Sequence, residues 1–213
     1  MKNKTELKRK NNSPIDYYLA VRPLIGIFEC GDAGVIKEFE GKIFFALIDV
    51  LGHGREAHKL ADTVKGFFGG NYFREPIEVI KGLHKYIKGS RGLVAGIGLL
   101  DLETNLLKYA GIGNINLKIY DTSSRNFKHI ISKEGIMGYT ISTPRQEMME
   151  ITEKEVIIVY TDGIKEYFGL EDHPTLLDKD VKTIAIQIIQ KFSRKSDDAA
   201  CLVIKYKNIK EMS

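Results

Sequence analysis

The sequence has little cysteine and no long apolar run, and both absences narrow the kinds of protein it can encode. Its 213 residues include only two cysteines, Cys30 and Cys201, which lie far apart and form no Cys-x-x-Cys pair. This usage suits a reducing compartment in which thiols stay free. No window approaches the ~18 consecutive apolar residues that are needed to cross a bilayer. We therefore predict a cytoplasmic protein that has no membrane partner.

The chain also lacks a strong excess of one charge. Its net charge of +4 comes from 32 basic and 28 acidic residues, and part of the excess lies in residues 1–10. A nucleic-acid partner needs basic residues clustered on one folded face, so we predict none. Polar residues rather than an apolar segment follow the basic opening, which excludes a secretory signal. We predict a disordered basic tail over residues 1–14 and a single domain over residues 15–213, because a second core would have to be unusually small.

Hydrophobic patterning predicts an α+β protein. Nearly continuous apolar strands are expected at 42–50, 155–160 and 199–206, and helical spacing of apolar residues occurs at 55–68, 75–88 and 180–192. Residues 17–29 are predicted as one strand that runs into a loop, and residues 93–111 and 116–131 as two hairpins of a central β-meander. Residues 135–149 are assigned to loop and short strand. The order of elements predicts a two-layer β-sandwich covered by helices on its outer faces.

Acidic residues stand where the predicted strands begin or end. Asp49 ends a strand, Asp32 and Asp162 follow strands, and Asp197 precedes the last one. Neighbouring strands lie ~4.8 Å apart, so such positions can bring carboxylates close together. Carboxylates at that spacing repel and raise one another's pKa unless a cation is bound. Oxygen ligands without His or Cys at ligand spacing favour Mg²⁺ or Mn²⁺.

A pair of such cations suits phosphate chemistry. Two ions ~3.5–4 Å apart can share a water molecule, lower its pKa and direct it at a phosphorus atom. The sequence contains no Gly-x-Ser-x-Gly motif that would supply a serine nucleophile. These observations predict hydrolysis of a phosphate ester by a metal-activated water, without a covalent intermediate.

Four segments, in this order along the chain, resemble the SpoIIE-type branch of the metal-dependent (type 2C, PPM) Ser/Thr protein phosphatases. They are Gly31-Asp32, Asp49-Val50-Leu51-Gly52-His53-Gly54, Tyr160-Thr161-Asp162-Gly163 and Asp197-Asp198-Ala199. The resemblance implies the α-β-β-α sandwich of that family and two Mn²⁺ or Mg²⁺ ions. It implies that Asp49 bridges both ions and that the Val50 carbonyl completes one coordination sphere. Asp32 would then serve one ion, while Asp162 and Asp197 serve the other. Either member of the pair Asp197-Asp198 can face the site, and we prefer Asp197.

Three further segments are similar to the stand-alone stressosome phosphatases of the RsbX type. They are Ser90-Arg91-Gly92, Tyr109 to Ile115 and Gly135 to Tyr139, with Gly113-Asn114 where most SpoIIE-type enzymes have Gly-His. This similarity implies that the substrates are phosphorylated STAS-domain proteins of a stressosome, in a general stress response. Two alternatives stay open. One is a phosphatase that acts on an anti-anti-sigma factor in partner switching, and the other is a non-catalytic pseudo-phosphatase that binds partners.

Some residues near these motifs have simpler interpretations. We expect His53 to lie beside the site rather than to ligate a metal, and we expect both cysteines to be buried in strands. Arg22, Arg55 and Arg91 each have the forked donors that bind phosphate, but most arginines are solvated surface charges and we prefer none of them. Asn114 either orients a water molecule or serves as a turn residue.

Overall fold

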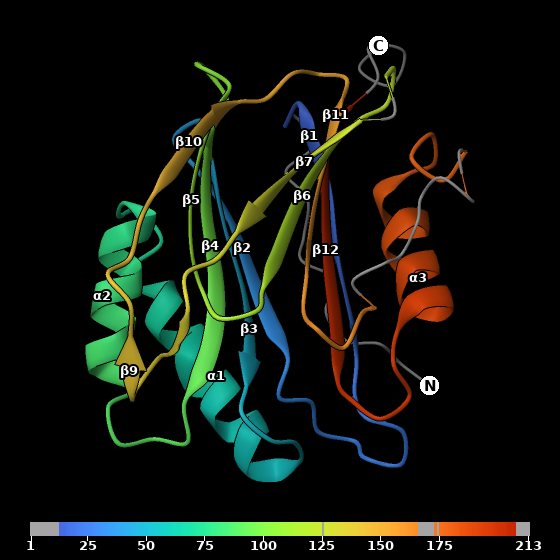
Figure 1. Ribbon diagram of the computed structural model, residues 1–213. Helices are drawn as coiled ribbons and strands as arrows, with labels where there is room; N and C mark the ends of the chain where they lie inside the picture. Colours follow the sequence, from blue (N-terminus) through green and yellow to red (C-terminus); the bar gives the residue numbers. More distant parts are fainter. Residues whose placement is uncertain (1–12, 125, 166–172, 174, 208–213) are drawn as a thin grey trace.

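The computed structural model describes residues 13–124, 126–165, 173 and 175–207 (Figure 1). The predicted tail therefore lies outside the described residues except for its last two. Ser13 is buried, and the Pro14 carbonyl accepts a hydrogen bond from the backbone N–H of Lys207 at 2.9 Å. These two residues belong to the folded part of the chain.

Two antiparallel sheets of five strands form the centre of the molecule. The strands of the first sheet, in spatial order, are β1 (Ile15–Arg22), β12 (Ala199–Tyr206), β11 (Glu155–Tyr160), β6 (Asn116–Asp121) and β7 (Phe127–Ile131). Those of the second are β10 (Glu147–Glu150), β5 (Leu106–Ile112), β4 (Leu93–Asp101), β3 (Lys42–Val50) and β2 (Ala33–Phe39). A small third ladder pairs β8 (Gly135–Ile136) with β9 (Thr140–Ile141).

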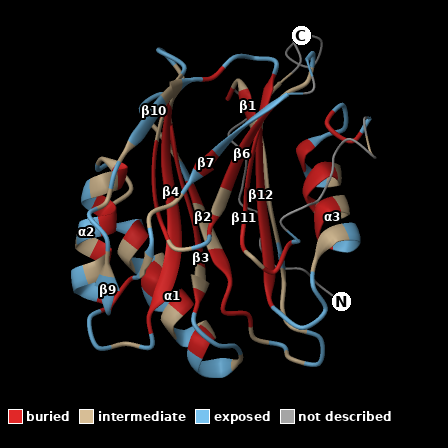
Figure 2. Ribbon diagram, in the orientation of Figure 1, coloured by how far each residue is buried: buried red, intermediate tan, exposed pale blue. Residues whose placement is uncertain are grey.

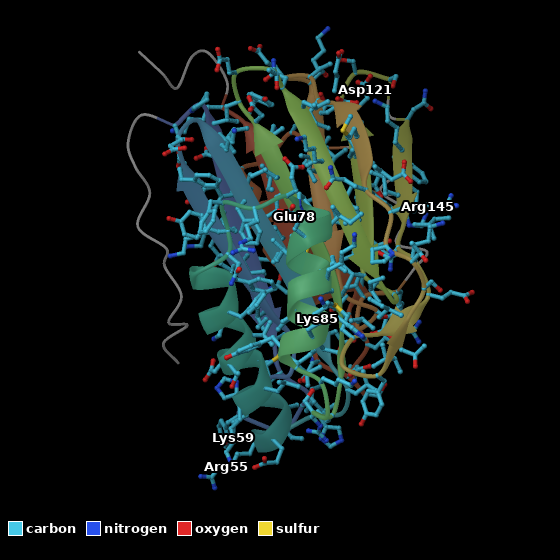
Figure 3. All side chains as sticks on the ribbon, turned by 90° about the vertical axis from the view of Figure 1, so that its left-hand side faces the viewer. Arg55, Lys59, Glu78, Lys85, Asp121 and Arg145 are labelled. Atoms are coloured by element: carbon cyan, nitrogen blue, oxygen red, sulfur yellow. The ribbon has the colours of Figure 1, made fainter. Side chains whose placement is uncertain are left out.

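In the part of the chain that the structure describes, three helices cover the outer faces of the sheets. Helices α1 (Arg55–Gly69) and α2 (Pro76–Tyr86) lie on the second sheet, and α3 (Val181–Phe192) lies on the first (Figure 1). Charged residues of α1 and α2, such as Lys59, Glu78 and Lys85, are exposed on the side away from the sheet (Figure 3). This α-β-β-α arrangement confirms the predicted fold class. Among the residues that the structure describes, no helix is both long and apolar enough to span a bilayer.

Apolar side chains fill three layers, one between the sheets and one under the helices on each side. Figure 2 shows that most strand residues of both sheets are buried, whereas each helix has both buried and exposed residues. Strand β3 shows how one strand serves two layers. Phe45 and Leu47 point between the sheets, whereas Phe44 and Ala46 pack under α1 and α2. Because successive side chains of a strand point to opposite faces, a strand buried on both faces must be apolar at nearly every position.

The structure corrects three of the local predictions. Residues 17–29 are not one strand, because β1 ends at Arg22 and a loop follows. Strand β2 was not predicted at all. The two central hairpins do not form a meander, since β4 and β5 belong to one sheet and β6 and β7 to the other. The ambiguous region 135–149 contains the small β8–β9 ladder and the beginning of β10, which pairs with β5.

Close packing between the sheets predicts opposite effects for one substitution at two glycines. An added Cβ at Gly98, in β4, would overlap the buried ring of Phe45, whereas at Gly66, exposed in α1, it would meet no atom within 4 Å. Gly98→Ala should therefore lower the free energy of unfolding by roughly 1–3 kcal/mol because of overpacking. Gly66→Ala should raise it by about 0.5–1 kcal/mol because alanine favours the helix. Urea unfolding curves measure both, and equal effects would contradict the packing described.

Candidate active site

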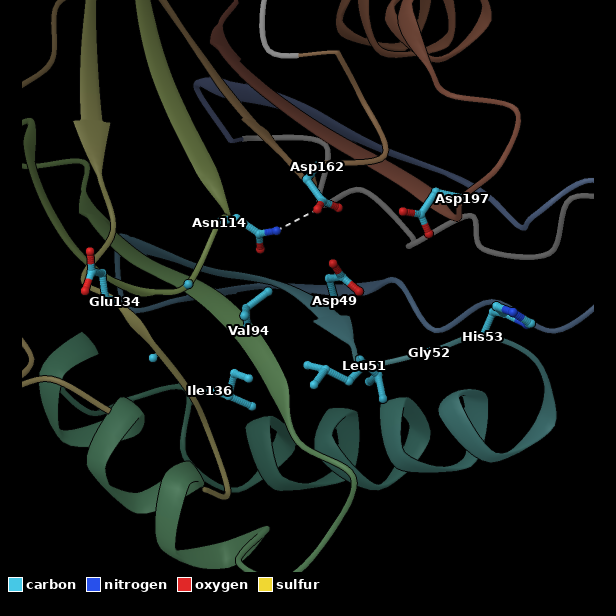
Figure 4. Close-up of a pocket in the computed structure, with 13 residues that line it drawn as sticks. Asp49, Leu51, Gly52, His53, Val94, Asn114, Glu134, Ile136, Asp162 and Asp197 are labelled. Carbon is cyan, nitrogen blue, oxygen red and sulfur yellow. Dashed lines mark hydrogen bonds between the residues drawn. The ribbon is translucent and has the colours of Figure 1, made fainter. Parts of the chain in front are cut away.

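Three of the predicted aspartates line one cleft at the end of the sandwich. Asp49 lies near the end of β3, Asp162 directly after β11 and Asp197 shortly before β12, around a cavity of about 500 Å³ (Figure 4). Strand β3 belongs to the second sheet, while β11 and β12 are neighbours in the first. The carboxylates therefore meet between two sheets rather than along the edge of one sheet.

Asp32 lies behind this cleft. It is buried and directly precedes β2, so the expectation that it follows a strand was wrong. The Thr161 hydroxyl donates a hydrogen bond of 2.6 Å to its Oδ2 atom and itself accepts one of 2.9 Å from the Ala200 N–H. The carboxyl groups of Asp32 and Asp49 are close enough to form a hydrogen bond when one of them is protonated. The structure thus brings all four predicted aspartates to one region.

The site concentrates negative charge in a poorly solvated place. Burial, and then the charges of Asp162 and Asp197, raise the pKa of Asp49 to about 7. Burial and the neighbouring Asp49 raise the pKa of Asp32 well above its ordinary value, and burial with the Asp197 charge raises the pKa of Asp162. The Arg194 guanidinium lowers the pKa of Asp162 but does not cancel this rise. At neutral pH a bound cation would stabilise the ionised carboxylates.

The donor set fits Mg²⁺ or Mn²⁺. Three aspartates with carboxylate oxygens, which these hard cations prefer, line the cleft together with Val50; they are Asp49, Asp162 and Asp197. Within the described part of the chain, no three His, Cys, Asp or Glu side chains converge tightly enough to enclose one ion. Mg²⁺ usually keeps several water ligands and takes only one or two carboxylates, so a pair of ions that share these aspartates does not need such a cage.

The adjacent residues Asp197 and Asp198 have different surroundings. Asp198 is buried, and its two carboxylate oxygens accept hydrogen bonds from the N–H groups of Leu24 and Gly31, each at 2.7 Å. The exposed Asp197 lines the cleft instead. This geometry favours Asp197 as the ligand and makes Asp198 the anchor of the loop between β1 and β2.

Asn114 has a contact that the sequence did not reveal. Its Nδ2 atom donates a hydrogen bond of 2.6 Å to Oδ2 of Asp162 (Figure 4). The turn that presents it depends on Gly113, which has a φ of +88° and lies where a Cβ would overlap Val94. Asn114 therefore orients a candidate metal ligand. The Gly-Asn pair was the only sequence signal for this role, and nothing in the sequence indicated that Glu134 and Ile136 also line the cleft.

The three arginines that were considered for phosphate binding, none of which was preferred, have different surroundings. The two Nη atoms of Arg22 donate to the backbone carbonyls of Pro23, Arg194 and Asp197, which directs them at the backbone rather than at a phosphate. Arg55 is exposed at the start of α1, and Arg91 lies against Gly52 at the rim of the cleft. His53 also lies at the rim, away from Asp49 (Figure 4). Both cysteines are buried as predicted, but only Cys201 lies in a strand (β12), whereas Cys30 lies in the loop between β1 and β2.

Comparisons with known proteins agree on the fold. The family model described as Stage II sporulation protein E (SpoIIE) matches residues 40–207, which include Asp49, Asp162 and Asp197 but not Asp32. A structure from a study of the bacterial stressosome, "a modular system that has been adapted to control secondary messenger signaling", superposes with a TM-score of 0.81 and 26% identity over 90% of this chain and 99% of that one.

Two other solved structures are less similar in sequence. RsbX in complex with magnesium gives a TM-score of 0.78 and 18% identity over 91% of this chain and 96% of that one. The PP2C phosphatase domain of SpoIIE from Bacillus subtilis, with a fragment of its regulatory domain, gives a TM-score of 0.73 and 15% identity. The match covers 92% of this chain and 63% of that one. No curated protein sequence matches the chain significantly.

The raised pKa values predict that the metal-free protein loses stability as pH rises. The folded state holds the Asp49 proton up to a pKa of about 7, whereas the unfolded chain releases it near pH 4. The stabilisation is therefore complete below pH 4 and is lost as pH rises through 7. In EDTA, the free energy of unfolding should fall by roughly 1–3 kcal/mol between pH 5 and 8.

Two substitutions separate this effect from ordinary titration. Asp49→Asn should at least halve the fall in the free energy of unfolding between pH 5 and 8, because the amide does not ionise. Asp101→Asn is the control, since hydrogen bonds from Thr104 and Glu103 lower the pKa of Asp101 and its stabilisation is already complete above pH 4. It should leave the fall unchanged. A wild-type protein that is equally stable at pH 5 and 8 in EDTA would show that the carboxylates are not crowded.

Proposed function

The chain belongs to the SpoIIE family of PP2C-type serine/threonine phosphatases, and we propose that it removes phosphate from phosphoserine or phosphothreonine in cytoplasmic STAS-domain proteins of a stressosome. One observation supports the proposal more strongly than the others. Asp49, Asp162 and Asp197, which come from two different sheets, surround a single cleft inside the matched range.

Two divalent cations, Mn²⁺ or Mg²⁺, would supply a water of lowered pKa and positive charge for the phosphate oxygens. We assign Asp49 to both ions, Asp32 to one, and Asp162 and Asp197 to the other, with the Val50 carbonyl as a further ligand. Thr161 and Asn114 each donate a hydrogen bond to one of these carboxylates. Such donors hold a ligand in one orientation and favour its ionised form.

The lining of the cleft supports attack by water rather than by a hydroxyl or thiol side chain. None of the described residues that line it carries a hydroxyl or a thiol group. Both cysteines are buried elsewhere, and burial raises the pKa of each thiol far above neutrality, which makes both poor nucleophiles. A phosphoenzyme formed on serine, threonine, tyrosine or cysteine would need such a group within reach of the phosphorus, so the lining speaks against those four nucleophiles.

The assignment of the substrate rests on the stressosome relative. That structure is matched over nearly its whole length at 26% identity, so the likeness is not confined to the metal motifs. Phosphatase assays with a panel of phosphorylated STAS proteins would identify the substrate. We expect a stressosome scaffold protein to be dephosphorylated faster than a lone anti-anti-sigma factor of a partner-switching system.

The neighbouring aspartates offer a matched test of the metal mechanism. With a phosphorylated STAS protein and Mn²⁺, Asp197→Asn should lower kcat/KM by about 10³-fold, because a metal ligand is worth several kcal/mol in the transition state. Asp198→Asn should mainly lower the melting temperature, because it weakens the hydrogen bonds to Leu24 and Gly31. Calorimetric titration with Mn²⁺ should show weakened binding for the first variant only.

Two results would reject this mechanism. One is full phosphatase activity of the wild type in excess EDTA. The other is a wild type that binds Mn²⁺ and a STAS protein tightly but releases no phosphate, which would instead make the chain a non-catalytic binding module.

A further inference from the structure

One side of the cleft carries apolar side chains that remain accessible. Leu51 and Ile136 line it on the side away from Asp162 and Asp197, and each keeps 36% of its surface exposed (Figure 4). Tyr139, beside Ile136, is 60% exposed. The side chains of Ile136 and Tyr139 lie beside Gly92, whose carbonyl accepts a hydrogen bond from the backbone N–H of Leu51 at 3.1 Å. A Cβ there would lie 2.6 Å from Ile136 and 2.9 Å from Tyr139. We call Leu51, Ile136 and Tyr139 the apolar wall.

The hairpin that carries most of this wall is fixed to the sheet. The N–H of Met137 donates a hydrogen bond to the Leu93 carbonyl at 2.8 Å, and the N–H of Leu93 donates one to the Met137 carbonyl at 3.3 Å. The N–H of Gly138 also bonds to Nδ1 of His84 at 3.2 Å, and the Met137 side chain is fully buried. Ile136 and Tyr139 are thus presented outward from an anchored base. A surface held in this way binds a ligand without first having to be ordered.

The cleft is larger than the phosphate chemistry requires. On the scale in which the cleft measures about 500 Å³, one water-sized group takes about 10–15 Å³, so a phosphate group and two cations take roughly 100 Å³. The cavity of about 500 Å³ therefore leaves space beside the carboxylates, and Leu51 and Ile136 of the apolar wall border that space. A substrate that fills the whole cleft must present an anion to one side and an apolar group to the other.

Because the cleft is continuous with the apolar wall, we propose that the substrate segment carries a large aliphatic side chain within two positions of the phosphorylated residue, and that Leu51 and Ile136 bind this side chain. The proposal rests on the proposed phosphatase function and adds a sequence preference to it. The preference comes from hydrophobic contact beside the phosphate, so it concerns the peptide around the phosphoserine rather than the fold of the partner.

Phosphoserine peptides with Mn²⁺ test the proposal on the full chain. A reference peptide has glycine at the two positions on each side of the phosphoserine, and further peptides carry leucine or asparagine at one of these positions. Leucine and asparagine have similar sizes, but only leucine gains from apolar contact. We expect leucine to give about tenfold higher kcat/KM than asparagine at one or more positions, mainly through a lower KM.

Variants of the wall then show where the preference arises. In Ile136→Ser and in Leu51→Ser, the leucine-to-asparagine ratio should fall to within about twofold of unity. The ratio is taken within each variant, so a general loss of activity cancels. Met148→Ser is the control, because Met148 is an exposed apolar residue of β10 that does not line the cleft. It should keep the wild-type ratio.

Three outcomes would overturn the proposal. The first is equal hydrolysis of leucine and asparagine peptides by a wild type that cleaves the glycine peptide, which leaves the phosphatase function intact. The second is an unchanged ratio in both wall variants. The third is a wild-type dimer that Ile136→Ser converts to a monomer in light scattering, which would assign the apolar wall to a second copy of the chain. A wild type that dephosphorylates a STAS protein but none of the peptides would reject this preference alone, and one that dephosphorylates neither would reject the phosphatase function with it.

Discussion

The crowding of carboxylates at the end of an apolar sandwich is the constraint on which the site depends. Asp32, Asp49 and Asp162 each have a pKa raised first by burial and then by neighbouring carboxylates. The three apolar layers stabilise the sheets independently of these residues, so the fold can hold carboxylates together at an energetic cost. This energetic cost arises at the carboxylates themselves, where a bound divalent cation would remove it. The same feature therefore destabilises the metal-free protein and favours metal binding.

Polar residues around the site act mainly on the backbone that carries the aspartates. Asp198 holds both ends of the loop that leads to Asp32, through Leu24 and Gly31. Arg22 donates to the carbonyl of Asp197, 3.0 Å away. Residues that the sequence alone associates with phosphate or metal chemistry thus position the neighbouring segments. The side chains that face the cleft are left for ligand and substrate contacts, acidic on one side and apolar on the other.

The sequence predicted the secondary structure best where the local apolar pattern agrees with burial in the folded protein. Strands β11 and β12 were predicted with the bounds that they have, because both faces of each are buried and their apolar runs are nearly continuous. Edge strand β2 was missed because its Lys37 and Glu38 interrupt the apolar pattern. The pairings of β6 with β11 and of β5 with β10 join distant parts of the chain, and no local signal specifies them. For the same reason, the contact of Asn114 with Asp162 and the position of Ile136 emerged only from the structure.

Anomalous scattering from crystals soaked in Mn²⁺ tests most directly whether the crowded carboxylates hold two cations. The account predicts two peaks in the cleft, about 3.5–4 Å apart, with Asp49 in contact with both. One peak should also contact Asp32, and the other Asp162 and Asp197. A crystal at saturating Mn²⁺ with no peak at Asp49, or with ions bound only outside the cleft, would contradict the account.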